Sequence, residues 1–88
     1  MDPAAPNPSR GPVAFSLRVY DGGAVTLEVV DAMGRLVQRA ELAAGDPGMR
    51  HWIWDGRDAT GRTTPAGYYR VRAKSPSGGM SRGLVRVN

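Results

Sequence analysis

Apolar and polar residues alternate with a period of two over most of this 88-residue chain. Over residues 13–20, every second position is a large apolar residue, and the positions between them carry Ala, Ser, Arg and Tyr. Such alternation is typical of a strand with one buried face. Similar segments, bounded by Gly, Pro and Asp turns, predict further strands at residues 25–30, 35–42, 49–54, 68–75 and 80–88. We therefore expect six strands, with a seventh if residues 8–12 or the connection 55–67 contribute one.

Short turns between these segments predict an antiparallel arrangement. Residues 21–23, with the sequence DGG, supply the positive-φ conformations of a tight hairpin between the first two strands. In DAMG, Asp31 is placed to accept hydrogen bonds from backbone amides, and Gly34 is free to adopt a positive φ. Residues 35–42 would also suit a helix by composition, but eight residues between two turns are short for one. We predict an all-β fold, a small antiparallel sandwich.

The N-terminal residues differ in composition from the rest of the chain. Residues 1–12 contain four prolines and few large apolar side chains. Such a segment cannot bury enough apolar surface to order itself, so we expect a linker at residues 1–11 and a sandwich domain at residues 12–88. The N-terminus also lacks the basic start and apolar stretch of a signal peptide. We expect the chain to be a segment of a longer protein.

The charge composition narrows the classes of partner. The chain carries twelve cationic side chains, eleven of them Arg, and a net charge of +4. These cations are scattered, whereas a phosphate-binding surface needs them clustered, so we expect no nucleic-acid binding. No apolar run approaches the ~20 residues that cross a bilayer, so we expect no membrane insertion. The absence of cysteine excludes disulfides and thiolate metal sites.

No residues combine into a recognisable catalytic or metal-binding pattern. The loop DGRDATG resembles a calcium loop only loosely, because its aspartates do not recur at alternate positions with a distal glutamate. We interpret Asp55 and Asp58 as caps of turn amides, and Gly56 and Gly61 as residues in the left-handed conformation. His51 is the sole histidine, without a second metal ligand or a positioned nucleophile in the sequence. We expect no enzyme activity, no cofactor and no metal.

The stretch HWIWDGRDATGRTTPAGYYRVRA holds both tryptophans and two of the three tyrosines. Trp52 and Trp54 are two positions apart and share one face of a strand. Tyr69 begins the apolar face of the following strand, and Tyr68 begins the opposite face. A small sandwich without disulfides needs large side chains in its centre, so we interpret the tryptophans as core residues. An exposed aromatic strip for carbohydrate is the alternative.

Two motifs at a characteristic spacing point to a family. VDAMGRLV matches a pattern of strand, D-x-x-G-R, strand, and WDGRDATGRTTPAGYY matches W-D-G-x-D-x-x-G-x-x-x-x-x-G-x-Y. From about residue 6 the chain resembles the immunoglobulin-like domain of the flagellar hook-capping protein family, a module also found at the C-termini of exported bacterial proteins. The resemblance implies a small immunoglobulin-like or fibronectin III-like β-sandwich. It also implies structural roles for the motif residues Asp31, Gly34, Arg35, Trp54, Asp55, Gly56, Asp58, Gly61, Pro65, Gly67 and Tyr69.

Specific roles follow for several of these motif residues. Arg35 is free to pair with Asp31 or to stack on an aromatic ring. Gly67 is expected to let the chain enter the fifth strand without a Cβ clash, and Pro65 is tolerated because it precedes that strand. Trp54 is expected to anchor the core, like the buried tryptophan of other immunoglobulin-like sandwiches.

The chain also resembles the C-terminal sorting domains of type IX secretion. The shared features are PNP at residues 6–8, PAGYY at residues 65–69 and an apolar, basic last strand that includes residues 82–87. The sorting pattern favours lysine in this strand, where the chain has Arg82 and Arg86.

These resemblances imply a non-catalytic C-terminal module of an exported or cell-surface bacterial protein, which acts as a spacer, attachment or sorting domain. The alternatives are an assembly module like that of the hook cap and a carbohydrate-binding accessory module. The expected partners are proteins, either export or surface-assembly machinery or the upstream domains of the same chain. The candidate partner surface is a ladder of outward-facing arginines on the last two strands, formed by Arg70, Arg72, Arg82 and Arg86. The alternative is a solvated face rich in arginine.

Overall fold

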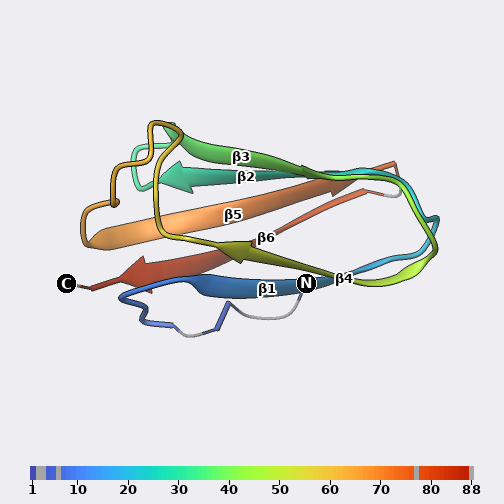
Figure 1. Cartoon of the computed structure of the whole chain (residues 1–88), viewed down its shortest axis with the longest axis horizontal. Helices are drawn as coiled ribbons and strands as arrows, with labels where there is room; N and C mark the ends of the chain where they lie inside the picture. The colour runs from blue at the N-terminus through green and yellow to red at the C-terminus, as the bar shows by residue number, and fades with distance from the viewer. Residues whose placement is uncertain (2–3, 6, 77, 88) are drawn as a thin grey trace.

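In a computed structural model, which describes residue 1 and residues 4–5, 7–76 and 78–87, the chain forms six strands and no helix. The strands are β1 (Val13–Val19), β2 (Val25–Asp31), β3 (Leu36–Leu42), β4 (Gly48–Trp54), β5 (Gly67–Ser75) and β6 (Gly78–Arg86). Figure 1 shows them running along the long axis of the molecule, with the connections gathered at its two ends. β1 pairs with β4, and the other sheet has the order β3-β2-β5-β6. The predicted all-β sandwich is confirmed, and none of the described residues belongs to a helix that could span a membrane.

The core lies between the two sheets and is built from the alternate apolar residues of the strands. Its largest fully buried members are Trp54 at the end of β4 and Phe15 in β1. Trp52 is half-buried and its ring stacks on Phe15, with 5.7 Å between the ring centroids. The remaining core side chains are Ala4, Val13, Leu17, Val19, Val25, Leu27, Val29, Tyr69, Val71, Ala73 and Leu84. The interpretation of the tryptophans as core residues is confirmed for Trp54.

β3 is the edge strand of the four-stranded sheet, which explains its ambiguous composition. Among the described strands it pairs only with β2, and the register shifts between Val29 and Val30 of that neighbour. Its side chains are exposed or half-buried throughout, so polar residues such as Gln38 and Arg39 are tolerated. The strand prediction for residues 35–42 is confirmed, because a solvated edge strand needs little apolar surface.

The tight hairpin predicted at residues 21–23 is wrong. β1 does not pair with β2; its antiparallel partner is β4, with Phe15 opposite Trp52. The DGG segment instead carries the chain from one sheet to the other. Gly22 has a φ of +69°, and its carbonyl accepts a 2.9 Å hydrogen bond from the Gly45 amide. A Cβ on Gly22 would meet the Gly45 carbonyl oxygen, so glycine is needed because the two sheet-crossing loops approach closely.

The segment expected to be a free linker packs against the sandwich. We call the described residues among 4–11 the N-terminal strap. Ala5 and Ala14 of β1 exchange two backbone hydrogen bonds of 3.1 and 2.8 Å. Ser9 is buried; its amide donates to the Val85 carbonyl at 2.9 Å, and its carbonyl accepts from the Val87 amide at 2.8 Å. The strap therefore joins edge strands of both sheets through backbone hydrogen bonds. These bonds form although the strap has few large apolar side chains, because they use backbone groups alone.

Candidate functional site

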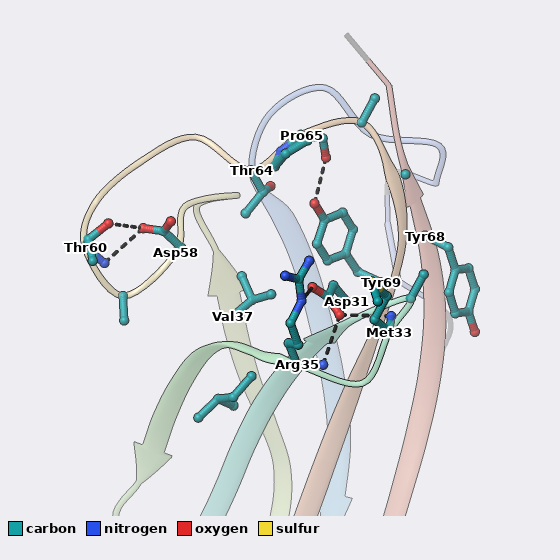
Figure 2. A pocket seen from close by; sticks show the side chains of 15 residues that line it. Asp31, Met33, Arg35, Val37, Asp58, Thr60, Thr64, Pro65, Tyr68 and Tyr69 are labelled. Atoms are coloured by element: carbon teal, nitrogen blue, oxygen red, sulfur yellow. Dashed lines mark hydrogen bonds and ion pairs between the residues drawn. The ribbon is translucent and has the colours of Figure 1, made fainter.

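The two sequence motifs meet at one end of the sandwich and enclose a groove of about 560 Å³. One wall is the β2–β3 turn, and the other is the connection between β4 and β5 (Figure 2). We call this space the motif groove. Its lining includes Asp31, Met33, Arg35, Leu36, Asp58 and Tyr68.

The β2–β3 turn is organised by the carboxylate of Asp31. One of its oxygens, Oδ1, accepts hydrogen bonds of 2.9 Å from the Met33 and Arg35 amides, and Oδ2 accepts one of 2.8 Å from Arg35 Nε. The backbone bond from Arg35 is the largest cause that holds the pKa of Asp31 below its ordinary value. Gly34 has a φ of +82°, which the turn requires. The predicted turn and the Asp31–Arg35 pair are both confirmed.

Asp58 plays the same part in the connection between β4 and β5. Its Oδ1 accepts hydrogen bonds from Thr60 Oγ1 at 2.6 Å, from the Thr60 amide at 2.9 Å and from the Arg62 amide at 3.0 Å. The bond from the Thr60 hydroxyl is the main cause that lowers the pKa of Asp58. Asp55 likewise accepts a 2.9 Å bond from the Arg57 amide. The prediction that these aspartates cap turn amides is confirmed.

The glycines of this connection adopt the expected conformations, but the reason why glycine is needed at Gly67 differs from the predicted one. Gly56 and Gly61 have φ values of +79° and +88°. Gly67 has a φ of +148°, but a Cβ there would meet nothing within 4 Å. The clash predicted at Gly67 is therefore wrong, and the backbone conformation at the start of β5 is what favours glycine. Among the described residues, no three His, Cys, Asp or Glu side chains gather as a metal-binding group.

Behind the groove, the Trp54 indole is the centre of a buried group of side chains. Its Nε1 donates a 2.9 Å hydrogen bond to the Arg57 carbonyl, and its ring lies 5.6 Å from that of Tyr69. The Tyr69 hydroxyl donates a 2.7 Å bond to the Pro65 carbonyl. The guanidinium of Arg86 lies 5.1 Å from the indole centroid. We call Trp54, Tyr69, Arg86 and Gly56 the indole cluster.

Arg86 is a buried cation, contrary to its predicted place on an outward ladder. Its Nη1 donates to Ser9 Oγ at 3.3 Å and to the Gly11 carbonyl at 2.9 Å. Its Nε is buried and has no hydrogen-bond partner among the described residues. A Cβ on Gly56 would collide with the guanidinium, so this glycine provides the space that the arginine fills. The indole, the strap and the glycine together enclose the charge.

The predicted arginine ladder does not exist, although β5 and β6 do pair. Arg70 lies opposite Gly83 and points outward, while Arg82 lies opposite the buried Val71, on the other face of the sheet, where it stays exposed and donates from Nε to the Met1 carbonyl at 2.8 Å. Arg72 faces Ser81 in the same way that Arg70 faces glycine. A sequence signal for this placement exists. Arg82 and Arg86 are each two residues from Leu84, so burial of that leucine turns both arginines toward the core side.

Sequence reasoning also missed a contact between the sole histidine and a serine. Ser16 Oγ lies 2.9 Å from His51 Nδ1, because the two residues are opposite each other on β1 and β4. The pair is exposed on the outer face of its sheet and lies outside the motif groove. Cross-strand pairing accounts for this contact, and the alternation pattern of either strand alone does not reveal it.

Comparison with known proteins identifies what this arrangement is similar to. Residues 8–79 match the family model of the FlgD Ig-like domain. The basal-body rod modification protein FlgD of Salmonella typhimurium is 33% identical over 55 residues, which cover 62% of this chain and 24% of that protein. The chain thus spans about a quarter of this curated relative's length.

Solved structures show the same fold. The crystal structure of FlgD from Xanthomonas campestris has a TM-score of 0.71 and 27% identity, over 93% of this chain and 59% of that one. The structure of PorU from Porphyromonas gingivalis has a TM-score of 0.71 and 26% sequence identity, over 96% of this chain and 9% of the PorU chain. The structure of PorZ from the same organism has a TM-score of 0.73 and 22% sequence identity, over 97% of this chain and 11% of the PorZ chain. This likeness shows the fold alone.

Proposed function

Because this chain belongs to the FlgD Ig-like domain family, we propose that it is a non-catalytic module of an exported or cell-surface bacterial protein. It acts there as a spacer, attachment or sorting domain. The observation that carries the proposal is the use of the motif side chains. The carboxylates of Asp31 and Asp58 accept the amide hydrogen bonds of their own turns, and Trp54 is buried. These side chains hold together the turns at one end of the sandwich, which supports a structural role.

The similar proteins support protein partners. The structure of FlgD from Xanthomonas campestris bears on hook capping, which is essential for flagellar assembly. An assembly module that works by protein–protein contact is therefore the second candidate for this chain. Its partners would be export or surface-assembly machinery, or the upstream domains of its own polypeptide. Fold alone does not decide between these roles, since sandwiches serve unrelated functions.

The placement of the aromatic residues speaks against a carbohydrate platform. Such a platform needs aromatic rings exposed side by side, and the two tryptophans of the predicted strip lie against the core instead. Trp54 contacts Tyr69 and Trp52 stacks on Phe15. We propose no carbohydrate role. We also propose no nucleic-acid binding, because the cations are dispersed along the chain, and no membrane insertion, because no apolar run approaches the ~20 residues that cross a bilayer.

The proposal is tested in the full-length parent protein. Residues 12–88 are deleted in one variant and replaced by an unrelated sandwich domain of similar length in another. We expect deletion to abolish surface display or assembly while the activity of any upstream domain persists. Restoration by the unrelated domain assigns a spacer, and failure of the unrelated domain assigns attachment, sorting or assembly. Normal display after deletion, combined with loss of a chemical activity, would contradict the proposal.

A further inference from the structure

Several large apolar side chains lie exposed at the groove end of the four-stranded sheet. Met33 is 79% exposed, Leu36 57%, Tyr68 42% and Val85 41%. Met33, Leu36 and Tyr68 line the motif groove together, and Tyr68 lies directly opposite Val85 in the β5–β6 register. These side chains therefore form one continuous surface, and a gathering of this kind marks a site of protein contact more often than single exposed residues do.

Two arginines complete this surface. The Arg35 side chain is 74% exposed, and among the described residues only its Nε has a hydrogen-bond partner, the Asp31 carboxylate. Arg70 binds neutral oxygens, donating to Tyr68 Oη at 2.7 Å and to Ser81 Oγ at 3.0 Å. We call Met33, Leu36, Tyr68, Val85, Arg35 and Arg70 the docking patch. In Figure 2, the Arg35 side chain lies between Val37 and Asp31, whereas the Tyr68 ring lies on the far side of Tyr69 and points away from Arg35.

The exposed tyrosine is already held in place before any partner arrives. A Cβ on Gly83 would collide with the Tyr68 ring, so the ring lies against the bare backbone of β6. The Arg70 guanidinium lies 5.8 Å from the ring centroid and binds its hydroxyl. A side chain fixed in this way loses little conformational freedom on binding, which favours affinity.

The composition of the docking patch is that of a protein interface. Tyr, Met and Arg are enriched in interface centres, and Lys and Glu are depleted. The patch contains the first three types and neither of the last two. Tyr and Arg are also the residues that most often dominate binding free energy. An apolar surface with two arginines at its margin is suited to a partner that offers both apolar and acidic groups.

The charges argue for an acidic partner and against a second copy of this chain. A two-fold contact would bring Arg35 and Arg70 of one copy near those of the other, and the chain carries a net charge of +4. The carboxylates beside the groove, Asp31 and Asp58, already accept several internal hydrogen bonds each. They are poorly placed to neutralise a neighbouring copy. A partner with free carboxylates would complement Arg70, which bonds neutral oxygens, and the terminal nitrogens of Arg35, whose Nε alone bonds Asp31 among the described residues.

We propose that the docking patch binds a protein segment in which carboxylates alternate with apolar side chains. The apolar side chains occupy the motif groove against Met33 and Leu36, and the carboxylates pair with Arg35 and Arg70. This inference rests on the proposed function, since it identifies the surface and the partner chemistry of an attachment or assembly module. Charge pairing across the margin sets specificity, and the apolar contact with Tyr68 supplies affinity.

The proposal is tested with the 88-residue chain labelled with ¹⁵N and two synthetic peptides. The first alternates Glu with Val, and the second replaces every Glu by Gln. We expect the Glu peptide to shift the amide signals of residues 33–37, 67–70 and 83–86, with the Gln peptide binding at least about tenfold more weakly. Equal binding of the two peptides, shifts centred elsewhere, or no binding by either would overturn the proposal.

Matched variants distinguish binding at the docking patch from nonspecific binding elsewhere on the chain. Tyr68→Ala and Arg70→Gln should each weaken binding of the Glu peptide by about tenfold. Ile53→Ala is the control, because Ile53 is 65% exposed on β4, in the other sheet, and should bind as the original chain does. Dispersed amide signals verify that each variant is folded. Self-association of the free chain, abolished by Leu36→Ser, would overturn the proposal in favour of a second copy.

Failure of this titration and failure of the proposed function are distinguishable. The peptide experiment uses the isolated chain and needs no export, whereas the deletion experiment needs the parent protein and no knowledge of the surface used. A parent that loses display on deletion, together with a chain that ignores both peptides, would keep the module role and reject the docking patch.

Discussion

The indole cluster and the part of the docking patch formed by Tyr68, Arg70 and Val85 lie on opposite faces of the β5–β6 strand pair. The neighbouring residues Tyr69 and Tyr68 belong to the indole cluster and to the docking patch, respectively. Tyr69 is 5% exposed and packs on Trp54, while Tyr68 is 42% exposed and lies over Gly83. Each face has an arginine over an aromatic ring: Arg86 lies over Trp54 on the inner face, and Arg70 lies over Tyr68 on the outer face. The inner arginine is enclosed by the protein's own backbone and indole, and the outer one keeps its charge at the surface. Tyrosine and arginine thus stabilise the fold on the inner face, and on the outer face they remain available to contact a partner.

The largest expected effect concerns the inner face. Trp54→Ala should lower the free energy of unfolding by roughly 3–5 kcal/mol, as truncation of large aromatics in packed cores does. Urea denaturation followed by circular dichroism measures the loss. Trp52→Ala is the control and should cost less, because Trp52 is half-buried. A loss below about 1 kcal/mol at Trp54 would mean that the indole is not a central core residue.

The second prediction isolates the contact between glycine and arginine in the indole cluster. Gly56→Ala and Gly61→Ala both force a Cβ into a positive-φ position, which costs about 1–2 kcal/mol. Only the Cβ at Gly56 also collides with Arg86, while that at Gly61 meets nothing within 4 Å. Gly56→Ala should therefore cost about 1–3 kcal/mol more than Gly61→Ala in thermal or urea unfolding. Equal losses would show that the guanidinium moves aside freely.

The neighbouring tyrosines provide the sharpest test of the difference between the faces. Tyr69→Phe removes the hydrogen bond to the Pro65 carbonyl and should cost about 0.5–1.5 kcal/mol in urea unfolding. Tyr68→Phe removes a hydroxyl at the surface and should change the free energy of unfolding by less than about 0.5 kcal/mol. If the two variants were equally destabilised, Tyr68 would have a structural role rather than one in binding.

The smallest effect is a dependence of stability on pH at the groove. The pKa values of Asp31 and Asp58 are lowered in the folded chain, chiefly by hydrogen bonds from the Arg35 amide and the Thr60 hydroxyl. Their ionised forms therefore favour folding. This contribution is fully present above the unfolded pKa of about 4 and is lost as the pH falls through the folded pKa values.

Urea midpoints measured between about pH 6 and pH 2 test this dependence. We expect the midpoint to fall on acidification, and the fall to be smaller in a variant that combines Asp31→Asn and Asp58→Asn. The indole cluster contains no carboxylate, so its contacts should persist to lower pH than the groove turns. An unchanged pH dependence in the double variant would contradict this assignment.

Much of the fold was predictable because each strand has its own alternation of apolar and polar residues in the sequence. Alternation placed all six strands, and Asp31, Gly34 and Arg35 formed the predicted turn because its hydrogen bonds are local. What alternation does not specify is which strands pair. The hairpin expected between β1 and β2 was wrong for that reason, since a turn sequence does not distinguish a hairpin from a crossing between sheets.

The site was predictable to the extent that its contacts are local in sequence. Trp54 was recognised from its motif, but its partner Arg86 lies 32 positions later and was assigned to the surface. A buried arginine is rare, and its burial depends on a space at Gly56 and acceptors at Ser9 and Gly11 that come together only in the folded chain. The motif groove could not be predicted for the same reason, because its two walls are distant in sequence and meet only in the folded chain.

The N-terminal strap gives the domain a mechanical property. Ser9 and Arg86 pair in parallel, so a force that draws the chain before Ser9 away from the chain after Arg86 acts along the strand direction. The Ser9–Val85 and Val87–Ser9 bonds, with the two bonds from Arg86, then bear the load together in shear instead of opening one by one. Resistance to pulling is governed by the unfolding rate, and this geometry slows forced opening without enlarging the core.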